Sequence, residues 1–211
     1  MIGSAKSKAK ELLKDNLWNV FGAIVVVGVI SFLIELIWKA TGLTTTETYD
    51  IMGVSYEVTK TNSLASLIGS IISLITAAGL SFYVLNIVRG TKVGINEIFG
   101  YLKKNILTII LVSILEGLFI AVGFVLLIIP GIVIALGLSL SSYVLIDNQD
   151  LSFMDVIKKT WEMMKGHKIE YFLFGLSFIG WILFCAFIIP LIYVAPYITL
   201  AEAVYYESIK G

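Results

Sequence analysis

Reactive side chains are scarce in this sequence. Its 211 residues include one cysteine, Cys185, and one histidine, His167. A single cysteine excludes an intrachain disulfide, and the lack of a His/Cys cluster excludes the common zinc sites. Signatures of nucleotide-binding loops, zinc proteases and serine hydrolases are also absent. We therefore expect no metal, no cofactor and no enzymatic activity.

Charge is scarce as well. Charged residues make up 14% of the chain and hydrophobic residues 58%, with a mean hydropathy of +0.96. Soluble domains carry roughly a quarter charged residues, and one core of this size leaves much of its surface in water. The 15 basic residues equal the 15 acidic ones, so no basic field favours nucleic acid. The composition predicts an integral membrane protein whose main partner is the lipid bilayer.

Six apolar stretches are long enough to cross a bilayer, for which a helix needs about 20 residues. They span residues 17–38, 64–88, 105–129, 131–146, 169–189 and 191–206. Pro130 and Pro190 separate the members of the last two pairs, because proline interrupts a helix. We predict an all-α polytopic membrane protein, a single integral membrane domain over 1–211. Its six transmembrane helices form three helical hairpins, at about 17–88, 105–146 and 169–206.

The lysines and arginines fall on one side of this topology. All but two of the 15 lie in the segments 1–16, 89–104, 147–168 and 207–211. The loop 39–63 holds the remaining two, Lys39 and Lys60. Because cytoplasmic loops are rich in Lys and Arg, both termini are expected in the cytoplasm and 39–63 outside.

A short amphipathic segment precedes each hairpin on the cytoplasmic side, at 4–16, 94–104 and 151–166. In the third, Phe153, Ile157, Trp161 and Met164 repeat at helical spacing. We expect these segments to lie at the membrane interface, with lysine side chains reaching toward the head groups. The candidate head-group contacts are Lys103, Lys104, Lys158, Lys159, Lys165 and His167.

Two carboxylates fall inside predicted spans, where an ionisable group is costly and marks a candidate site. Glu116 lies roughly 16 Å beyond Asn105 at helical rise. It is either a protonatable or cation-binding group facing a cavity, or a neutral acid hydrogen-bonded to a serine or tyrosine. Glu202 either lines a polar seam with Tyr197 and Tyr205 or reaches the cytoplasmic interface.

The outer loop 39–63 is the one sizeable surface offered to the outside. Residues 49–56 resemble a small hairpin around Gly53. An external ligand or partner would meet this loop, unless it is an inert connector. The second and third hairpins also align without gaps from Ile128 and Ile188, which indicates either a duplication or chance similarity between apolar segments.

Several motifs of this chain resemble an uncharacterised family of bacterial integral membrane proteins, domain of unknown function 975. The resemblance rests on Asp147-Asn148, Met-Lys-Gly-His-Lys at 164–168, Leu-Ser-Phe-Ile-Gly-Trp at 176–181, Pro196-Tyr197, Tyr205, Ile-Pro-Gly at 129–131 and Leu-Lys-Asp-Asn-Leu-Trp at 13–18. Gln149 departs from the pattern, which has proline there. The resemblance implies a six-helix protein of the bacterial cytoplasmic membrane. The family is similar to the membrane domain of some glycerophosphodiester phosphodiesterases, which implies a lipid-side or regulatory role and transfers no catalytic residues.

These features predict a non-enzymatic membrane protein that handles an amphipathic ligand, either an anionic lipid or a membrane-active peptide, in transport, protection or immunity. Lysines at the head-group level and the two acids within the bundle motivate this hypothesis. One alternative is a small proton- or cation-coupled transporter that uses Glu116. Another is a scaffold or accessory subunit that holds a protein partner through the outer loop or the third amphipathic segment.

Overall fold

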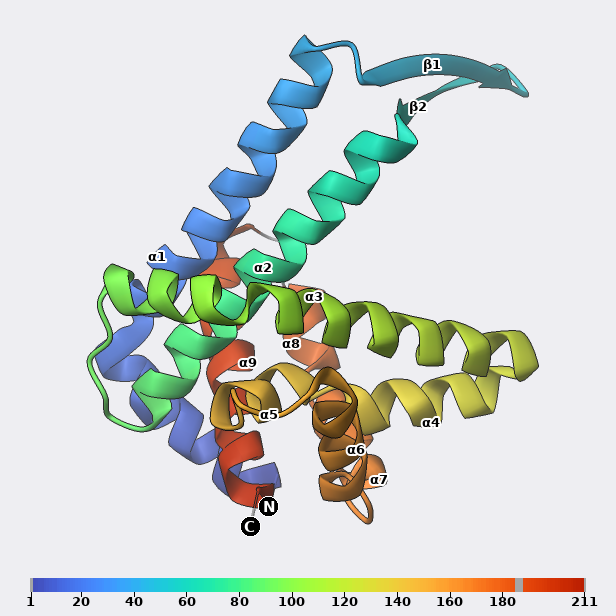
Figure 1. The fold of residues 1–211 in the computed structure, drawn as a ribbon. Helices are drawn as coiled ribbons and strands as arrows, with labels where there is room; N and C mark the ends of the chain where they lie inside the picture. The colour runs from blue at the N-terminus through green and yellow to red at the C-terminus, as the bar shows by residue number, and fades with distance from the viewer. Residues whose placement is uncertain (1, 185–187, 211) are drawn as a thin grey trace.

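The computed structural model describes residues 2–184 and 188–210 and is 79% helical (Figure 1). Its elements in chain order are α1 (Ile2–Ala40), β1 (Thr44–Ile51), β2 (Val54–Thr61), α2 (Ser63–Val88), α3 (Ile95–Leu126), α4 (Ile128–Leu138), α5 (Ser141–Asp147), α6 (Phe153–Met163), α7 (Lys168–Leu176), α8 (Ile179–Phe184) and α9 (Ile188–Ile209). The all-α prediction therefore needs one correction, since the outer loop forms two strands. Cys185 lies outside the described residues.

Within residues 2–184 and 188–210, four helical stretches are long and apolar enough to cross a membrane. They are Ile2–Ala40, Ser63–Val88, Ile95–Leu126 and Ile128–Asp147, which correspond to the first four predicted spans. The predicted span 169–189 is divided into α7 and α8, each too short to cross alone, and its last part includes residues outside the description. The structure thus supports four of the six predicted spans.

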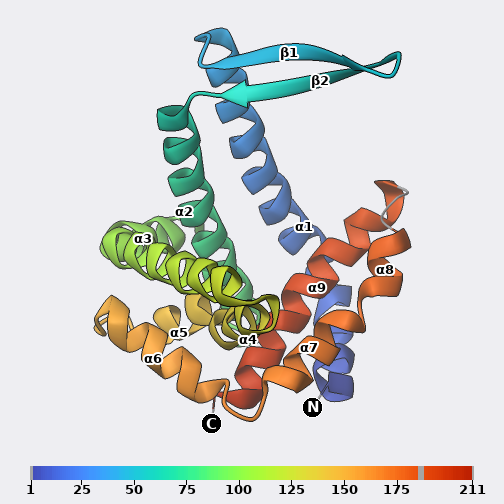
Figure 2. The same cartoon turned by 90° about the vertical axis from the view of Figure 1, so that its right-hand side faces the viewer.

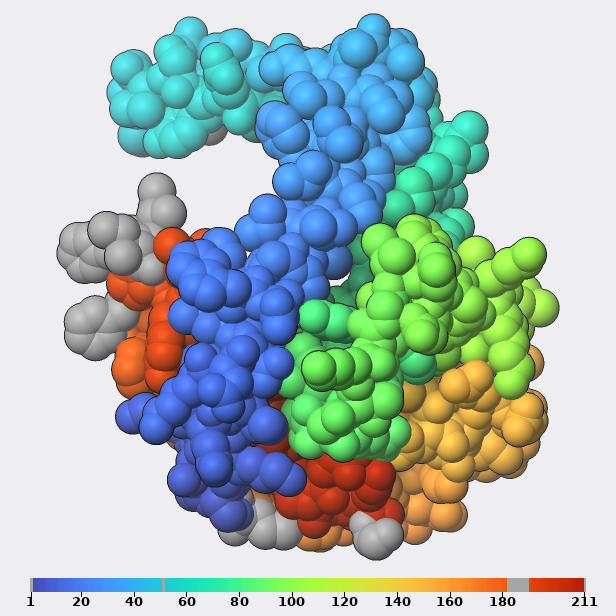
Figure 3. All heavy atoms as spheres, turned by 90° about the vertical axis from the view of Figure 1, so that its left-hand side faces the viewer, coloured from blue at the N-terminus to red at the C-terminus, as the bar shows by residue number. Residues whose placement is uncertain are grey.

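The outer loop is a β-hairpin that closes around Met52 and Gly53. β1 and β2 pair antiparallel, and Ile51 is the register partner of Val54. Met52 and Gly53 have φ angles of 53° and 79°. A two-residue turn with both φ angles positive matches the right-handed twist of the strands. The predicted hairpin around Gly53 is confirmed, and it stands clear of the helices at the tip of α1 and α2 (Figure 3).

The sequence predicted that the helices break at Pro130 and Pro190. In the structure both prolines lie inside helices. α3 ends at Leu126 and α4 begins at Ile128, so Pro130 lies in the first turn of α4. Pro190 likewise lies in the first turn of α9. Proline is tolerated there because the N–H groups of a first turn have no partner within the helix. The predicted break at Pro130 was therefore placed a few residues too late, and Pro190 lies within α9 rather than before it.

The hairpins diverge from a shared core. The α1–α2 hairpin extends in one direction, and α3–α4 projects to the side of it (Figures 1 and 2). The core joins the first part of α1, the end of α2, α5 and α9, with buried residues such as Leu13, Leu85, Val144 and Leu200. The projecting parts expose apolar side chains, including Val26, Phe32, Leu33, Val122, Val125 and Leu126.

The first two predicted amphipathic segments are not separate helices. Residues 4–16 form part of the first turns of α1, and residues 95–104 form the first turns of α3. Ala5, Ala9 and Leu13 are buried in the core, and α1 packs along α9. This apolar face therefore contacts protein rather than lipid.

The third amphipathic segment does form its own helix, α6. The hydroxyl of Ser152 accepts a hydrogen bond from the Asp155 amide at 3.3 Å and donates one to the Asp155 carboxylate at 2.6 Å, which caps the start of the helix. Gly166, with a φ of 83°, follows its end. Ile157 and Met164 of its apolar face are buried in the protein.

Candidate functional site

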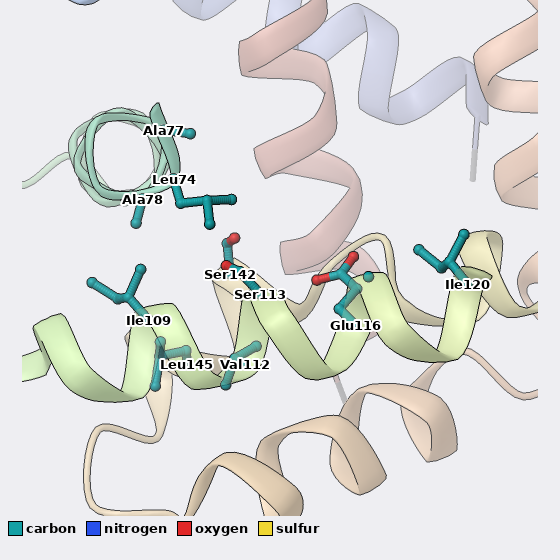
Figure 4. Close-up of a pocket in the computed structure, with 11 residues that line it drawn as sticks. Leu74, Ala77, Ala78, Ile109, Val112, Ser113, Glu116, Ile120, Ser142 and Leu145 are labelled. Carbon is teal, nitrogen blue, oxygen red and sulfur yellow. The ribbon is translucent and has the colours of Figure 1, made fainter. Parts of the chain in front are cut away.

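Glu116 faces a pocket between α2, α3 and α5. The pocket has a volume of about 280 Å³. Apart from Glu116, its lining includes Leu74, Ala78, Ile109, Val112, Ser113 and Ser142. In Figure 4 the Glu116 side chain projects from α3 into the space that Ser142 of α5 and Leu74 of α2 also border. The result is a mostly apolar pocket that holds one carboxylate and two hydroxyl groups.

Glu116 is half-buried, and its partner is a neutral one. The Ser141 hydroxyl donates a hydrogen bond to Glu116 Oε2 at 2.6 Å. Within the described parts of the chain, no lysine or arginine forms an ion pair with this carboxylate. The serine contact matches one of the two predicted interpretations, and the pocket matches the other. Such an arrangement can hold a group that donates hydrogen bonds or carries positive charge.

Glu202 lies in a second polar contact, between α7 and α9. The Tyr171 hydroxyl donates a hydrogen bond to Glu202 Oε1. The ring of Tyr171 also lies 5.3 Å from that of Tyr205, whose hydroxyl donates to the His167 carbonyl at 3.5 Å. Glu202 and Tyr205 are thus brought together through Tyr171, which the sequence analysis had not singled out.

Tyr197 does not join this group. It is buried among the rings of Phe178, Trp181 and Tyr193, with ring centroids 5.4 to 6.2 Å away. The predicted seam along α9 is therefore divided into a polar contact at Glu202 and an aromatic cluster at Tyr197. No hydrogen bond in the described residues joins Glu116 to Glu202.

The six candidate head-group contacts lie at the surface or partly exposed. Lys104 lies 3.8 Å from Asp150, Lys158 lies 4.0 Å from Asp155, and His167 Nδ1 lies 3.6 Å from Glu170. The Lys159 ammonium donates to the Asn148 side chain at 2.6 Å. Lys103 and Lys165 are exposed. Exposed pairs at these distances hold a lysine weakly, so the charges stay accessible.

A cluster of charges that the sequence analysis missed joins the ends of three helices. Arg89 Nη2 donates to Asp147 at 2.6 and 2.8 Å, and Arg89 Nε donates to Glu207 at 2.7 Å. The Tyr206 hydroxyl also donates to Asp147, at 2.8 Å. Partial burial of Arg89 opposes its charge, but hydrogen bonds to Asp147 and Glu207 outweigh this and raise its pKa. The cluster fastens α2, α5 and α9 to one another.

A repeated segment could have drawn attention to these helix ends. Leu-Ser-x-Tyr-Val-Leu occurs at 80–85 in α2 and again at 140–145, at α5. The equivalent valines, Val84 and Val144, are both buried, as is Val204 in α9. Arg89, Asp147 and Glu207 lie shortly after these valines, at or near the ends of α2, α5 and α9.

Gln149, which departs from the motif pattern of the family, has a defined place in the structure. Its side-chain oxygen accepts a hydrogen bond at 3.2 Å from Asn105, which is buried in α3. Its amide nitrogen donates to the Ile146 carbonyl at 3.3 Å. Gln149 therefore holds the turn after α5 against α3, and a proline at this position could make neither bond.

Comparison with known protein families shows where the chain is similar to one of them. Residues 118–211 match the family described as protein of unknown function (DUF975). This range covers α4 to α9 and the last turns of α3. No curated protein and no solved structure matches the chain. The resemblance to that family is confirmed, and the likeness to phosphodiesterase membrane domains stays a prediction.

Proposed function

We propose that this chain, which matches the DUF975 family over residues 118–211, is an integral membrane protein that handles an amphipathic ligand. The observation that carries the proposal is the Glu116 carboxylate in an otherwise largely apolar pocket between α2, α3 and α5. A site of this kind suits a molecule with an apolar body and a polar group. Handling would serve transport, protection or immunity, without chemical conversion of the ligand.

The size and charge of the pocket narrow the ligand. A volume of about 280 Å³ is at the lower limit for small-molecule sites, so it accommodates one polar group and a short apolar neighbour rather than a whole lipid. A carboxylate repels anionic head groups and favours ammonium or hydroxyl groups. Lysine side chains of a membrane-active peptide, or an amine-bearing lipid head group, meet this requirement.

Mass spectrometry of the protein in native nanodiscs tests the proposal. We expect at least one lipid or peptide to be enriched over the bulk membrane and lost in Glu116→Gln. Glu97→Gln is the matched control, because Glu97 lies in the first turn of the same helix and is exposed. A content identical to the bulk membrane in the unmodified protein would overturn the proposal.

A second candidate function is proton- or cation-coupled transport with Glu116 as the coupling group. It is favoured by the half-buried carboxylate whose hydrogen-bond donor is a neutral serine, since such an acid can exchange a proton or bind a cation. Flux into proteoliposomes should stop in Glu116→Gln and continue in Glu97→Gln. If flux continues in Glu116→Gln, the carboxylate is not the coupling group.

We further propose that the chain lies in the bacterial cytoplasmic membrane with both termini in the cytoplasm. The support is the position of the lysines and arginines and the apolar surface of the projecting hairpins. In this topology α7, α8 and α9 form the third hairpin and complete six spans.

Cysteine labelling tests this topology. Cys185→Ser removes the single cysteine of the sequence. In that background, Ser55→Cys in the β-hairpin should react with an impermeant maleimide on intact cells, and Lys10→Cys should react only after lysis. Labelling of Lys10→Cys on intact cells would place the N-terminus outside.

A further inference from the structure

A second cleft lies between α6 and the α3–α4 hairpin, apart from the Glu116 pocket. Its volume is about 390 Å³, and its walls are Phe119 from α3, Ile134 and Leu138 from α4, and Met154, Ile157 and Trp161 from α6. The surface of these walls is apolar. The exposed apolar side chains of Val122 and Val125 follow Phe119 along α3. The cleft is therefore close to surface that suits contact with lipid chains.

Trp161 is fixed as one wall of the cleft. It packs on α4 at Gly137, where an added Cβ would lie 2.5 Å from Cζ3 of the indole ring. The Lys168 ammonium lies 3.0 Å from the centroid of the ring. Contact with backbone and with a cation holds the tryptophan in place without filling the cleft.

The rim of the cleft carries positive charge with few counter-ions. The Lys158 side chain lines the cleft and is 68% exposed. Its Nζ atom lies 4.0 Å from Oδ1 of Asp155. Lys168, whose ammonium lies over the ring of Trp161, forms no ion pair with the residues that the structure describes, and burial lowers its pKa. An anionic group at this rim would therefore gain a cationic partner.

We propose that this cleft binds one acyl chain of an anionic phospholipid from the surrounding bilayer, with the phosphate group next to Lys158. A volume of about 390 Å³ is within the range of ligand pockets and suits part of a lipid, not all of it. The apolar walls hold the chain, and the Lys158 stem extends along them while its ammonium meets the phosphate. The site is independent of Glu116, so it does not rest on the function proposed above.

Fluorescence quenching in nanodiscs tests this site. Trp18→Phe, Trp38→Phe and Trp181→Phe leave Trp161 as the single tryptophan of the chain. Bromine on an acyl chain quenches a tryptophan that it contacts, so the probes are phosphatidylglycerol and phosphatidylcholine with brominated chains. We expect phosphatidylglycerol to reach half-maximal quenching of Trp161 at a mole fraction about fivefold lower than phosphatidylcholine requires. This factor corresponds to the attraction between one lysine and the anionic phosphate group.

Three variants separate the specific site from general attraction. Lys158→Glu should remove the preference for phosphatidylglycerol, whereas Lys10→Glu, which makes the same charge change on exposed α1, should keep it. Ile134→Phe should reduce quenching by both lipids because it fills the cleft. Equal quenching by the two lipids, or an equal loss of preference in Lys158→Glu and Lys10→Glu, would overturn the proposal. Should Ile134→Phe fail to fold, the comparison of the two exposed lysines still decides.

Discussion

Arg89, directly after α2, and Asp147, at the end of α5, lie 58 positions apart and form an ion pair in which one guanidinium nitrogen, Nη2, contacts both carboxylate oxygens. The two nitrogen-to-oxygen distances are 2.6 and 2.8 Å, and both side chains are more than two-thirds buried. Since Arg89 also binds Glu207, one guanidinium group contacts a carboxylate from each of the other two hairpins. The diverging hairpins are thus held together at one end while their tips remain apart.

Arg89→Lys should loosen this junction although it preserves the charge. Arginine places separate nitrogens, Nη2 and Nε, against Asp147 and Glu207, and the single nitrogen of lysine cannot contact both carboxylates in this way. We expect a loss of about 1.5 kcal/mol in the free energy of unfolding, a value that allows for the partial exposure of the group. Thermal unfolding in detergent measures it. The exposed Lys92→Ala, on the same loop, should change stability little, and equal losses in both variants would show that the ion pair contributes nothing.

Gly137→Ala should displace Trp161. The new methyl group would lie 2.5 Å from the indole ring, so the ring must move or α4 must shift. Overpacking of this kind costs about 1–3 kcal/mol. The emission maximum of a protein with Trp161 as its single tryptophan should change, and the midpoint of unfolding should fall. Gly100→Ala is the matched control, because a Cβ at Gly100 meets no atom within 4 Å. Stability there should rise slightly, since alanine favours helix.

Met52→Asn should stabilise the outer β-hairpin. Met52 has a φ of 53°, a left-handed conformation that asparagine adopts more easily than methionine. A gain of about 1 kcal/mol would slow proteolysis within the hairpin about fivefold, if cleavage follows local opening. Gly53→Val should have the opposite effect, because valine strongly disfavours the φ of 79° found there. Equal cleavage rates in the three proteins would show that the turn does not limit opening.

Local chemistry explains which parts of the fold could be predicted from the sequence. The hairpin around Gly53 depends on residues a few positions apart, and the sequence predicted it. The helix breaks near Pro130 and Pro190 were misplaced because a proline marks the first turn of a helix as readily as its end. The amphipathic stretch of α1 was interpreted as interfacial since periodicity shows an apolar face without showing what covers it.

Long-range contacts explain the rest. Ser141 of α5 contacts Glu116 although the two lie 25 positions apart in the sequence, and Glu207 contacts Arg89 across 118 positions. Nothing local identifies either partner, since serine and arginine are common near helix ends. The two clefts depend on how the hairpins pack, and nearly uniform apolar helices conceal which face is turned inward.

Variants of Glu202 and Tyr171 test whether the Glu202 carboxylate stabilises the structure or takes part in the function. Tyr171→Phe removes the hydroxyl that donates to a half-buried carboxylate, and should lower stability by about 1–2 kcal/mol. Glu202→Gln retains an oxygen acceptor of the same size and should cost less. In Tyr171→Phe/Glu202→Leu both polar partners are gone, so the combined loss should be smaller than the sum of the single losses.

Urea unfolding followed by tryptophan emission measures these differences in detergent. Losses that simply add would show that the two side chains do not interact energetically. The ligand content of Glu202→Gln in native nanodiscs completes the comparison with Glu116→Gln. Both carboxylates accept a hydrogen bond from a hydroxyl, but Glu116 lines a pocket and Glu202 lines neither that pocket nor the cleft at α6, so we expect Glu202→Gln to keep any species that Glu116→Gln loses. Loss of the same species from a stable Glu202→Gln would instead assign both acids to ligand handling.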